Sequence, residues 1–393
     1  MAKKTLRWKV PVLLLCTIVV VTLSAAGCGK KSIDPDASVY KIGAVLSLSG
    51  PASPLGQPEQ NSLKMLEEQM NAGEGVNGHK VQFIIEDDQS NPANAAAAIT
   101  KLINQEGVVA IIGSSSTGAT LAMVPVAESA KITQVCCAAG TVVTKPIKKY
   151  IFRTPPTDSM AIDRVLAYLK GNLKFKQIAI LHDANAYGTG GATELAAKAP
   201  AAGIEIVANE SYGSTDTDMT AQLTKIQQTP AQALVVWGTN PGPASIAKNM
   251  QQLGMKIPFI GSNGIANKTF ITLAGSAANG VAFPGGRMLI PSSITAGSEW
   301  RKAVDTFTAD YKTKYGKDAD TFAAHGWDAG TILTTAMKTA GTDKALIQST
   351  VQSTKGLVGI DGIYNFSPTN HDGLNASDLI MIKIENGAWV QIK

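Results

Sequence analysis

Short apolar runs alternate with longer amphipathic segments along most of the chain. Such runs occur at residues 40–46, 108–112 and 233–237, and none of them alternates cleanly between apolar and polar positions. Strands that are apolar throughout are typical of parallel sheets covered by helices on both faces. The segments between the runs, such as residues 59–70, carry apolar residues at helical spacing. This strand–helix rhythm predicts an α/β fold.

The rhythm occurs twice, which predicts two lobes, each a Rossmann-like unit built on a parallel sheet. It begins at Val39, is interrupted at residues 150–156, and starts again with a helix from Asp158. A chain of 393 residues is long enough for two domains of typical size. We expect the strands of the first unit at residues 40–46, 80–86, 108–112 and 133–137, and those of the second unit at residues 177–181, 205–208, 233–237 and 258–260.

Two long helices, at residues 298–315 and 322–340, are predicted after the second unit, and two apolar runs around Asn386-Gly387 predict a final hairpin. These helices must cover a surface that is already built. We therefore expect the chain to cross back to the first lobe and then return to the second, which gives a three-segment hinge and a cleft. The assignment is residues 39–156 plus about 286–356 for the N-terminal lobe, and residues 157–285 plus about 357–393 for the C-terminal lobe.

The stretch from Ile111 to Thr120 is the most informative one for function. A buried strand ends there in a glycine and several hydroxyl residues, and a helix follows. Free backbone N–H groups and hydroxyls at a helix N-terminus form a small-anion cradle that suits a carboxylate. Because ligands of parallel sheets bind outside the carboxyl ends of the strands, this loop should meet those at residues 47–58, 87–90 and 138–141. An ordinary N-capped connection is the alternative.

The N-terminus has the pattern of a secretory signal. A basic start, an apolar run from Val10 to Val21 and small residues precede Cys28. The Ala-Gly-Cys sequence resembles a bacterial lipoprotein signal, in which the cysteine becomes the lipidated first residue; plain secretion is the alternative. We expect a signal peptide at residues 1–27, a lipid anchor on Cys28 and a tether at residues 28–38, which places the protein in the periplasm or at the cell surface.

The charge balance and the cysteines exclude further classes of protein. The signal holds four of the 35 basic residues, so 31 basic side chains face 30 acidic ones in the rest of the chain, and no nucleic-acid partner is expected. Of the four cysteines, only Cys136 and Cys137 lie beyond Cys28. Adjacent cysteines seldom bond to each other, so we interpret them as buried thiols, with a vicinal disulfide as the alternative.

Several motifs occur in an order that resembles a known family. Together they are similar to the type I periplasmic binding proteins of the branched-chain amino acid class, the capture subunits of ABC importers, whose prototype binds Leu, Ile and Val. The resemblance runs from about residue 40 to the end of the chain and implies a Venus-flytrap fold with the ligand between the lobes. The motifs are residues 42–51 with Gly56, residues 86–88, residues 111–117, His182-Asp183 with Tyr187-Gly188, Gly261 with Asn263-Gly264, and Trp327-Asp328-Ala329.

The resemblance also implies a role for individual residues. Thr117, with Ser115 and Ser116 before it, would bind the ligand carboxylate. Backbone groups of the following loop and contacts from the second lobe would complete the site, and apolar residues would line the side-chain pocket. The backbone groups are those of Ala138 and Gly140, the second-lobe residues are Tyr187, Asn240 and Asn263, and the pocket residues are Leu55 and Phe322.

Two departures from the amino-acid binders leave the ligand open. The position of Asn263 commonly holds an acid that pairs with the ligand ammonium, and Asn240 stands where the prototype has an aromatic residue. A neutral amide cannot provide charge pairing in a desolvated cleft. Residues 50–62 also resemble the branch that takes up aromatic carboxylates. An α-amino acid and an aromatic or other non-amino carboxylate are therefore both retained.

Other functions are less well supported. Gly113-Ser114-Ser115-Ser116-Thr117 lacks the final glycine of a nucleophile elbow, so no catalytic residue is expected. Residues 86–88 lack the spacing of a calcium loop, so neither a metal nor a cofactor is expected, and His325 is interpreted as a core residue of a helix. The expected partners are the transmembrane subunits of an ABC permease. The protein itself is expected to be a monomer. A sensory ligand-binding module of the same fold is the rival.

Overall fold

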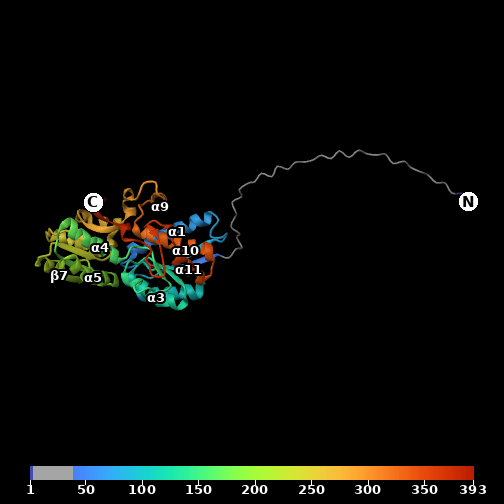
Figure 1. The fold of residues 1–393 in the computed structure, drawn as a ribbon. Coiled ribbons are helices and arrows are strands. Elements are labelled where there is room, and N and C mark those ends of the chain that lie inside the picture. Colours follow the sequence, from blue (N-terminus) through green and yellow to red (C-terminus); the bar gives the residue numbers. More distant parts are fainter. Residues whose placement is uncertain (3–38) are drawn as a thin grey trace.

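The computed structural model describes residues 1–2 and 39–393, and the latter form two α/β lobes that lie side by side (Figure 1). Most of the expected signal peptide, the tether and Cys28 lie outside the described residues. Within the described part, no helix is both long and apolar enough to cross a membrane.

The first lobe is built on a sheet of five strands, all parallel, in the order β2-β1-β3-β4-β5. Its strands are β1 (Tyr40–Leu46), β2 (Val81–Asp87), β3 (Ala110–Gly113), β4 (Thr133–Cys136) and β5 (Ile151–Arg153). Helices α1 (Ser53–Ala72) and α10 (Thr321–Ala340) pack on one face, and α2 (Pro92–Lys101) and α3 (Thr117–Ala130) on the other. Burial on both faces explains why these strands are apolar throughout.

The second lobe has a sheet of seven strands in the order β14-β13-β10-β9-β8-β6-β7. The strands are β6 (Gln177–Asp183), β7 (Glu205–Tyr212), β8 (Ala233–Trp237), β9 (Phe259–Gly261), β10 (Ala282–Gly286), β13 (Leu379–Glu385) and β14 (Ala388–Gln391). The expected C-terminal hairpin is confirmed: β13 and β14 are antiparallel and close one edge of the otherwise parallel sheet. The helices are α4 (Asp158–Tyr168), α5 (Ala186–Lys198), α6 (Thr220–Gln227), α7 (Gly242–Gln252) and α8 (Lys268–Ala274).

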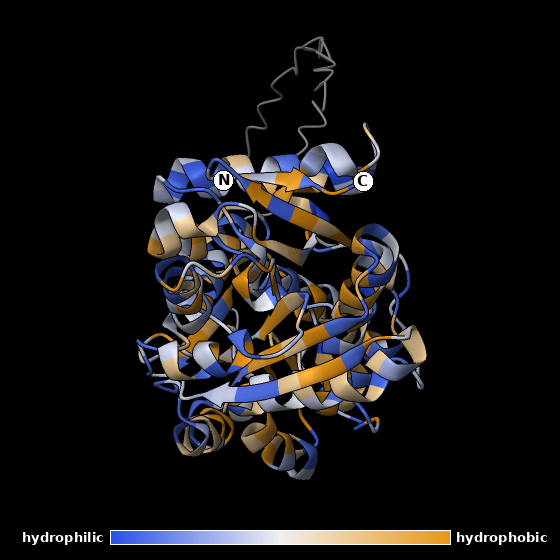
Figure 2. Cartoon of the chain, turned by 90° about the vertical axis from the view of Figure 1, so that its left-hand side faces the viewer, coloured by the Kyte–Doolittle hydropathy of each residue, from blue (hydrophilic) through white to orange (hydrophobic). Residues whose placement is uncertain are grey.

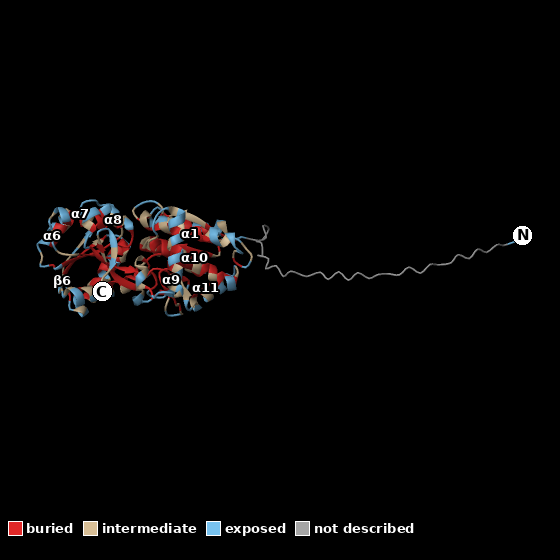
Figure 3. Cartoon of the chain, turned by 90° about the horizontal axis from the view of Figure 1, so that it is seen from above, coloured by how far each residue is buried: buried red, intermediate tan, exposed pale blue. Residues whose placement is uncertain are grey.

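Apolar residues concentrate on these two sheets. In Figure 2 hydrophobic colouring runs along strands inside the molecule, and in Figure 3 buried residues lie in the interior of each lobe. The eight strands expected for the two units are all present, with β7 continuing beyond Ala208 to Tyr212. The prediction of two lobes with parallel sheets is therefore confirmed.

After β10 the chain packs against first-lobe residues again. Helices α9 (Glu299–Tyr315), α10 and α11 (Lys344–Ser353) pack on first-lobe residues. The short strands β11 (Leu357–Val358) and β12 (Ile363–Tyr364) follow, in a segment that we had assigned to the second lobe. Tyr364 and Phe366 are instead fully buried in the first-lobe core, where the ring of Phe366 lies 5.4 Å from that of Phe152.

Helix α1 begins earlier than the expected residues 59–70. Pro54 lies in its first turn, where a backbone N–H has no partner within the helix, and the helix also includes Pro58. Gly56 permits the close approach of this turn to the end of β1, since a Cβ atom there would lie 2.2 Å from the carbonyl oxygen of Ser47. Leu55 therefore lies on a helix, where we had expected a loop.

Candidate ligand-binding site

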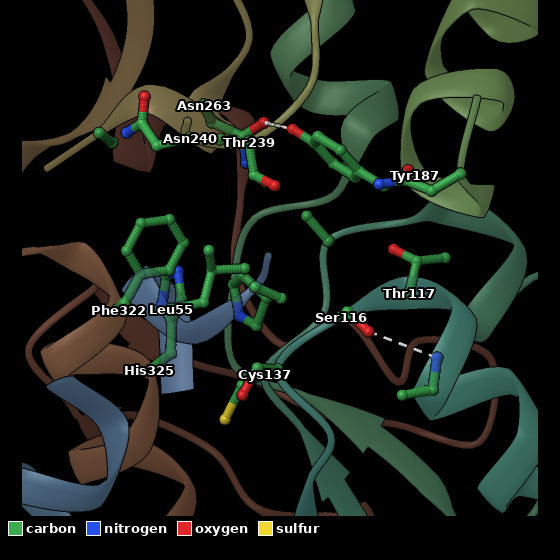
Figure 4. Close-up of a pocket in the computed structure, with 18 of the residues that line it drawn as sticks. Leu55, Ser116, Thr117, Cys137, Tyr187, Thr239, Asn240, Asn263, Phe322 and His325 are labelled. Atoms are coloured by element: carbon green, nitrogen blue, oxygen red, sulfur yellow. Dashed lines mark hydrogen bonds between the residues drawn. The ribbon is translucent and has the colours of Figure 1, made fainter. Parts of the chain in front are cut away.

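A cavity of about 300 Å³ lies between the two lobes. It is lined by residues that follow β2, β3 and β4 of the first lobe and β6, β8 and β9 of the second, which is where parallel sheets bind their ligands. Two of the predicted site residues, Ala138 and Gly140, are not among its lining. The others line it, namely Leu55, Ser115, Ser116, Thr117, Tyr187, Asn240, Asn263 and Phe322. All of these except Ser115 are labelled in Figure 4.

The N-terminus of α3 opens into this cavity. Ser116 is the N-cap residue, and its Oγ accepts a hydrogen bond of 3.4 Å from the N–H of Ala119. The N–H groups of Thr117 and Gly118 belong to the first helical residues, which have no acceptor within the helix. Thr117 is only 2% exposed, and its Oγ1 has no hydrogen-bond partner among the described residues. Unpaired donors and the positive end of the helix dipole therefore meet at one point.

Ser115 lines the cavity, but its hydroxyl is already engaged. Its Oγ accepts from the N–H of Ser47 at 3.1 Å and donates to the carboxyl of Glu59. Burial raises the pKa of Glu59 well above its usual value, which favours the uncharged form of this carboxyl. We infer that the bond between Ser115 and Glu59 holds the loop between β3 and α3 in place. Because the Glu59 carboxyl is uncharged, it does not repel an anionic ligand. Sequence reasoning did not find Glu59, because its partner is 56 positions away.

The loop after β4 differs from the expectation at two residues. We had expected Ala138 and Gly140 to offer backbone groups to the ligand, but their carbonyl oxygens accept hydrogen bonds of 3.2 and 2.9 Å from the guanidinium of Arg153. Ala139 lines the cavity in their place, and its carbonyl is also bonded to Arg153. The fully buried Arg153, 3.1 Å from Asp372, thus holds this loop in shape. Its own main chain ends β5, which the sequence pattern did not predict as a strand.

The second lobe presents a tyrosine and two amides. Tyr187 lies in the first turn of α5, and its hydroxyl donates to Asn263 Oδ1 at 2.9 Å (Figure 4). Burial raises the pKa of Tyr187 well above its usual value, so the hydroxyl stays protonated. Asn240 donates through Nδ2 to Asn267 at 2.9 Å, while its buried Oδ1 has no partner among the described residues. Asn240, which lines the cavity, therefore carries a second-lobe acceptor that no described residue satisfies.

Leu55 and Phe322 lie together on the side of the cavity away from Thr117 (Figure 4). Two polar residues that we had not placed in the site accompany them, His325 and Asp361, and both line the cavity. His325 was interpreted as a core residue of its helix; it is buried, but it also faces the cavity. Cys137 lines the cavity as well, and Cys136 and Cys137 are both free thiols, as expected.

Three contacts join the lobes beside the cavity. Thr321 Oγ1 donates to the carbonyl of Ala266 at 3.2 Å, and Asn267 Nδ2 donates to the carbonyl of Pro54 at 3.5 Å. An ion pair of 2.5 Å connects Lys268 of α8 with Asp318, just before α10. The lobes are thus in direct contact around the enclosed space.

The chain belongs to the family of periplasmic binding proteins, whose model matches residues 39–388. The leucine-, isoleucine-, valine-, threonine- and alanine-binding protein of Pseudomonas aeruginosa is 26% identical over 340 residues, which cover 85% of this chain and 88% of that protein. An extracellular ligand-binding receptor from Rhodopseudomonas palustris HaA2 has a similar structure, with a TM-score of 0.85, 28% identity, and coverage of 91% of this chain and 100% of that one.

A third comparison concerns a structure that contains a ligand. The branched-chain amino acid transporter substrate-binding protein LivJ from Streptococcus pneumoniae, in complex with isoleucine, matches with a TM-score of 0.79 and 26% identity. It covers 90% of this chain and 100% of its own. These relatives are binding proteins and not enzymes. The expected family, fold and class of function are therefore confirmed.

Proposed function

We propose that this protein is the extracytoplasmic receptor of an ABC importer, and that it captures a small carboxylate between its lobes. The observation that carries the proposal is the N-terminus of α3 at the cavity between the lobes, where the buried Thr117 hydroxyl has no partner among the described residues and two backbone N–H groups have no acceptor within the helix. Helix N-termini bind carboxylates because their N–H groups and dipole both favour negative charge. A cavity of about 300 Å³ is near the lower limit for small-molecule sites.

Closure of the lobes would couple binding to transport. A carboxylate held by α3 of the first lobe also meets Tyr187 and Asn240 of the second, so it stabilises the closed arrangement more than the open one. The contact between Thr321 and Ala266 forms only when the lobes meet. A permease could then distinguish the loaded receptor by its shape.

Two ligand classes fit this site. The relatives include binders of branched-chain amino acids, and the unpartnered Oδ1 of Asn240 could accept a bond from an α-ammonium group. The neutral Asn263 argues for a carboxylate without an amine, because its Oδ1 already accepts from Tyr187 and it carries no charge. Branched-chain amino acids are the main candidates because the relatives bind them. Carboxylates without an amine remain candidates because Asn263 carries no charge.

Location and partners belong to the same proposal. The signal pattern supports export, and Cys28 supports a lipid anchor that would hold the receptor at the membrane as a monomer. Labelling with a radioactive fatty acid tests the anchor. We expect the wild-type chain to be labelled and Cys28→Ser to be unlabelled; equal labelling of both would remove the anchor from the proposal.

A thermal-shift screen followed by calorimetry tests the ligand. The panel contains leucine, isoleucine and valine beside benzoate- and cinnamate-type acids, since a ligand that binds the folded state raises the melting temperature. We expect saturable binding of at least one carboxylate and no binding of its primary amide, which lacks the negative charge. Binding of the amide with equal affinity would contradict the anion cradle.

A further inference from the structure

The cavity has a second polar end, formed by His325 and Asp361. Their side chains are 5% and 2% exposed, and His325 Nδ1 lies 2.5 Å from Asp361 Oδ2. Figure 4 shows His325 beside Phe322 and Leu55, on the opposite side of the cavity from Thr117. This part of the cavity is where the family resemblance led us to expect only an apolar side-chain pocket.

Asp361 leaves one acceptor unused. Its Oδ1 is buried and has no hydrogen-bond partner among the described residues, although Asp361 lines the cavity. Gly286 of the second lobe faces this oxygen without a side chain: an added Cβ atom would lie 3.7 Å from Oδ1, at van der Waals distance, and both residues line the cavity. A buried carboxylate oxygen without a donor is unfavourable, so a ligand that supplies an O–H or N–H at this point would be bound more tightly.

The carboxylate of Asp361 is held in place by its neighbours. Asp328, one turn after His325 on α10, accepts backbone N–H bonds from Ile360 at 2.7 Å and from Asp361 at 2.9 Å. Burial, and then the charge of Asp361, raises the pKa of Asp328. The hydroxyl of Tyr364 lies 2.9 Å from the same carboxyl. The loop that carries Asp361 is thus tied to the helix that carries His325, which orients both side chains before any ligand arrives.

We propose that His325 and Asp361 form a second recognition site, which selects ligands that carry a hydrogen-bond donor at the end remote from the carboxylate. This inference rests on the proposed function, because it places the carboxylate at α3. The donor is a hydroxyl or an amine, which share the chemistry that Asp361 Oδ1 accepts. A ligand with a purely aliphatic or unsubstituted aromatic end, such as leucine or benzoate, would leave this oxygen unpaired. The second site therefore disfavours the branched-chain amino acids that the family relationship alone would favour.

Pairs of ligands that differ only in the remote donor test the proposal. Suitable pairs are benzoate with 4-hydroxybenzoate and with 4-aminobenzoate, cinnamate with 4-hydroxycinnamate, phenylalanine with tyrosine, and pentanoate with 5-hydroxypentanoate and with 5-aminopentanoate. We expect calorimetry to show that the wild-type protein binds the donor-bearing member of at least one pair about 10-fold or more tightly. The hydroxyl and amine arms identify which donor is preferred.

Two variants locate the preference in the structure. Asp361→Ala should remove it, so that both members of the pair bind within about twofold of each other. Thr117→Val is the matched control, since it should weaken both members equally and keep their ratio. Asp361→Ser serves if the alanine variant does not fold, and the wild-type pairs alone already test the preference.

The outcomes separate this inference from the proposed function. Equal binding of both members of every pair by the wild-type protein would overturn the second site and leave the carboxylate receptor standing. A preference that survives in Asp361→Ala would also overturn it. Failure of every carboxylate in the panel to bind would count against the receptor itself.

Discussion

Replacing Thr117 by valine isolates the contribution of one hydroxyl to ligand binding. Valine keeps the methyl group that packs against Gly140, where a Cβ atom would lie 2.5 Å from Thr117 Cγ2, and replaces only Oγ1. Because Oγ1 has no partner among the described residues, the folded chain itself loses no hydrogen bond. The unliganded variant should therefore be as stable as the wild type, or slightly more stable, since an unpaired buried hydroxyl is removed.

The size of the binding defect follows from the kind of bond that is lost. A hydroxyl that donates to a carboxylate forms a charge-assisted hydrogen bond, which contributes about 1.5–3 kcal/mol. At about 1.4 kcal/mol for each factor of ten, the dissociation constant should rise about 10- to 150-fold. The two N–H groups at the start of α3 remain, so binding should be weakened and not abolished.

Isothermal titration with the best ligand of the screen measures this change, and Thr117→Ser is the control. Serine keeps the hydroxyl and removes the methyl group, so it should retain most of the affinity. Melting temperatures without ligand show whether either variant is damaged. The reasoning is refuted if Thr117→Val binds as tightly as the wild type, or if the serine variant loses as much affinity as the valine variant.

Three further predictions concern the surroundings of the site. Arg153→Lys should lower the free energy of unfolding by about 2 kcal/mol in urea titrations, because three carbonyls, those of Ala138 and Gly140 in buried bonds, lose guanidinium donors; unchanged stability would contradict the proposed loop clamp. Lys268→Gln should weaken ligand binding by about fivefold or less and change the free energy of unfolding little, since it removes the exposed ion pair with Asp318 across the lobes and leaves the pair of Asp318 with Lys312 in place; high salt should mimic it in the wild type. Burial raises the pKa of Asp158 from 3.8 to about 7, so the native state holds its proton more tightly than the unfolded chain, and stability should fall as pH rises from about 4 to about 7. The loss is at most about 4 kcal/mol, and Asp158→Asn, which keeps an oxygen for the 3.3 Å bond from Trp237, should flatten this part of the pH profile of unfolding.

The elements that the sequence predicted well are those with local causes. The apolar strands are buried on both faces of their sheets, the Asn91 side chain caps α2 through the N–H of Ala93 at 2.8 Å, and the Asn-Gly turn joins β13 to β14. Each signal lies within a few residues, so a single sequence carries it. Helix α1 was placed too late because Pro54 and Pro58 were interpreted as loop residues. A first turn tolerates Pro54, while Pro58 lies inside the helix, where the sequence rule is against it.

The parts of the site that the sequence did not predict depend on residues far apart in the chain. His325 and Asp361 are 36 positions apart, Ser115 and Glu59 are 56 apart, and neither pair belongs to a recognisable spacing. A buried arginine such as Arg153 gives no sign in the sequence that it binds three carbonyls of a neighbouring loop. Such partners become visible only when the fold brings their elements together.

The two lobes differ in how their polar groups are held, and this difference suggests an order of events. In the first lobe, the donors near Thr117 are fixed by a helix and by a loop that Arg153 holds, so they are in place before a ligand arrives. In the second lobe, the Tyr187 hydroxyl already donates to Asn263 Oδ1, so its proton is not free for a first contact with a carboxylate. We therefore expect the carboxylate to bind first at α3, with the second lobe closing afterwards. A ligand-bound crystal form with open lobes should then show the carboxylate on the first lobe, and finding it on the second lobe would reverse this order.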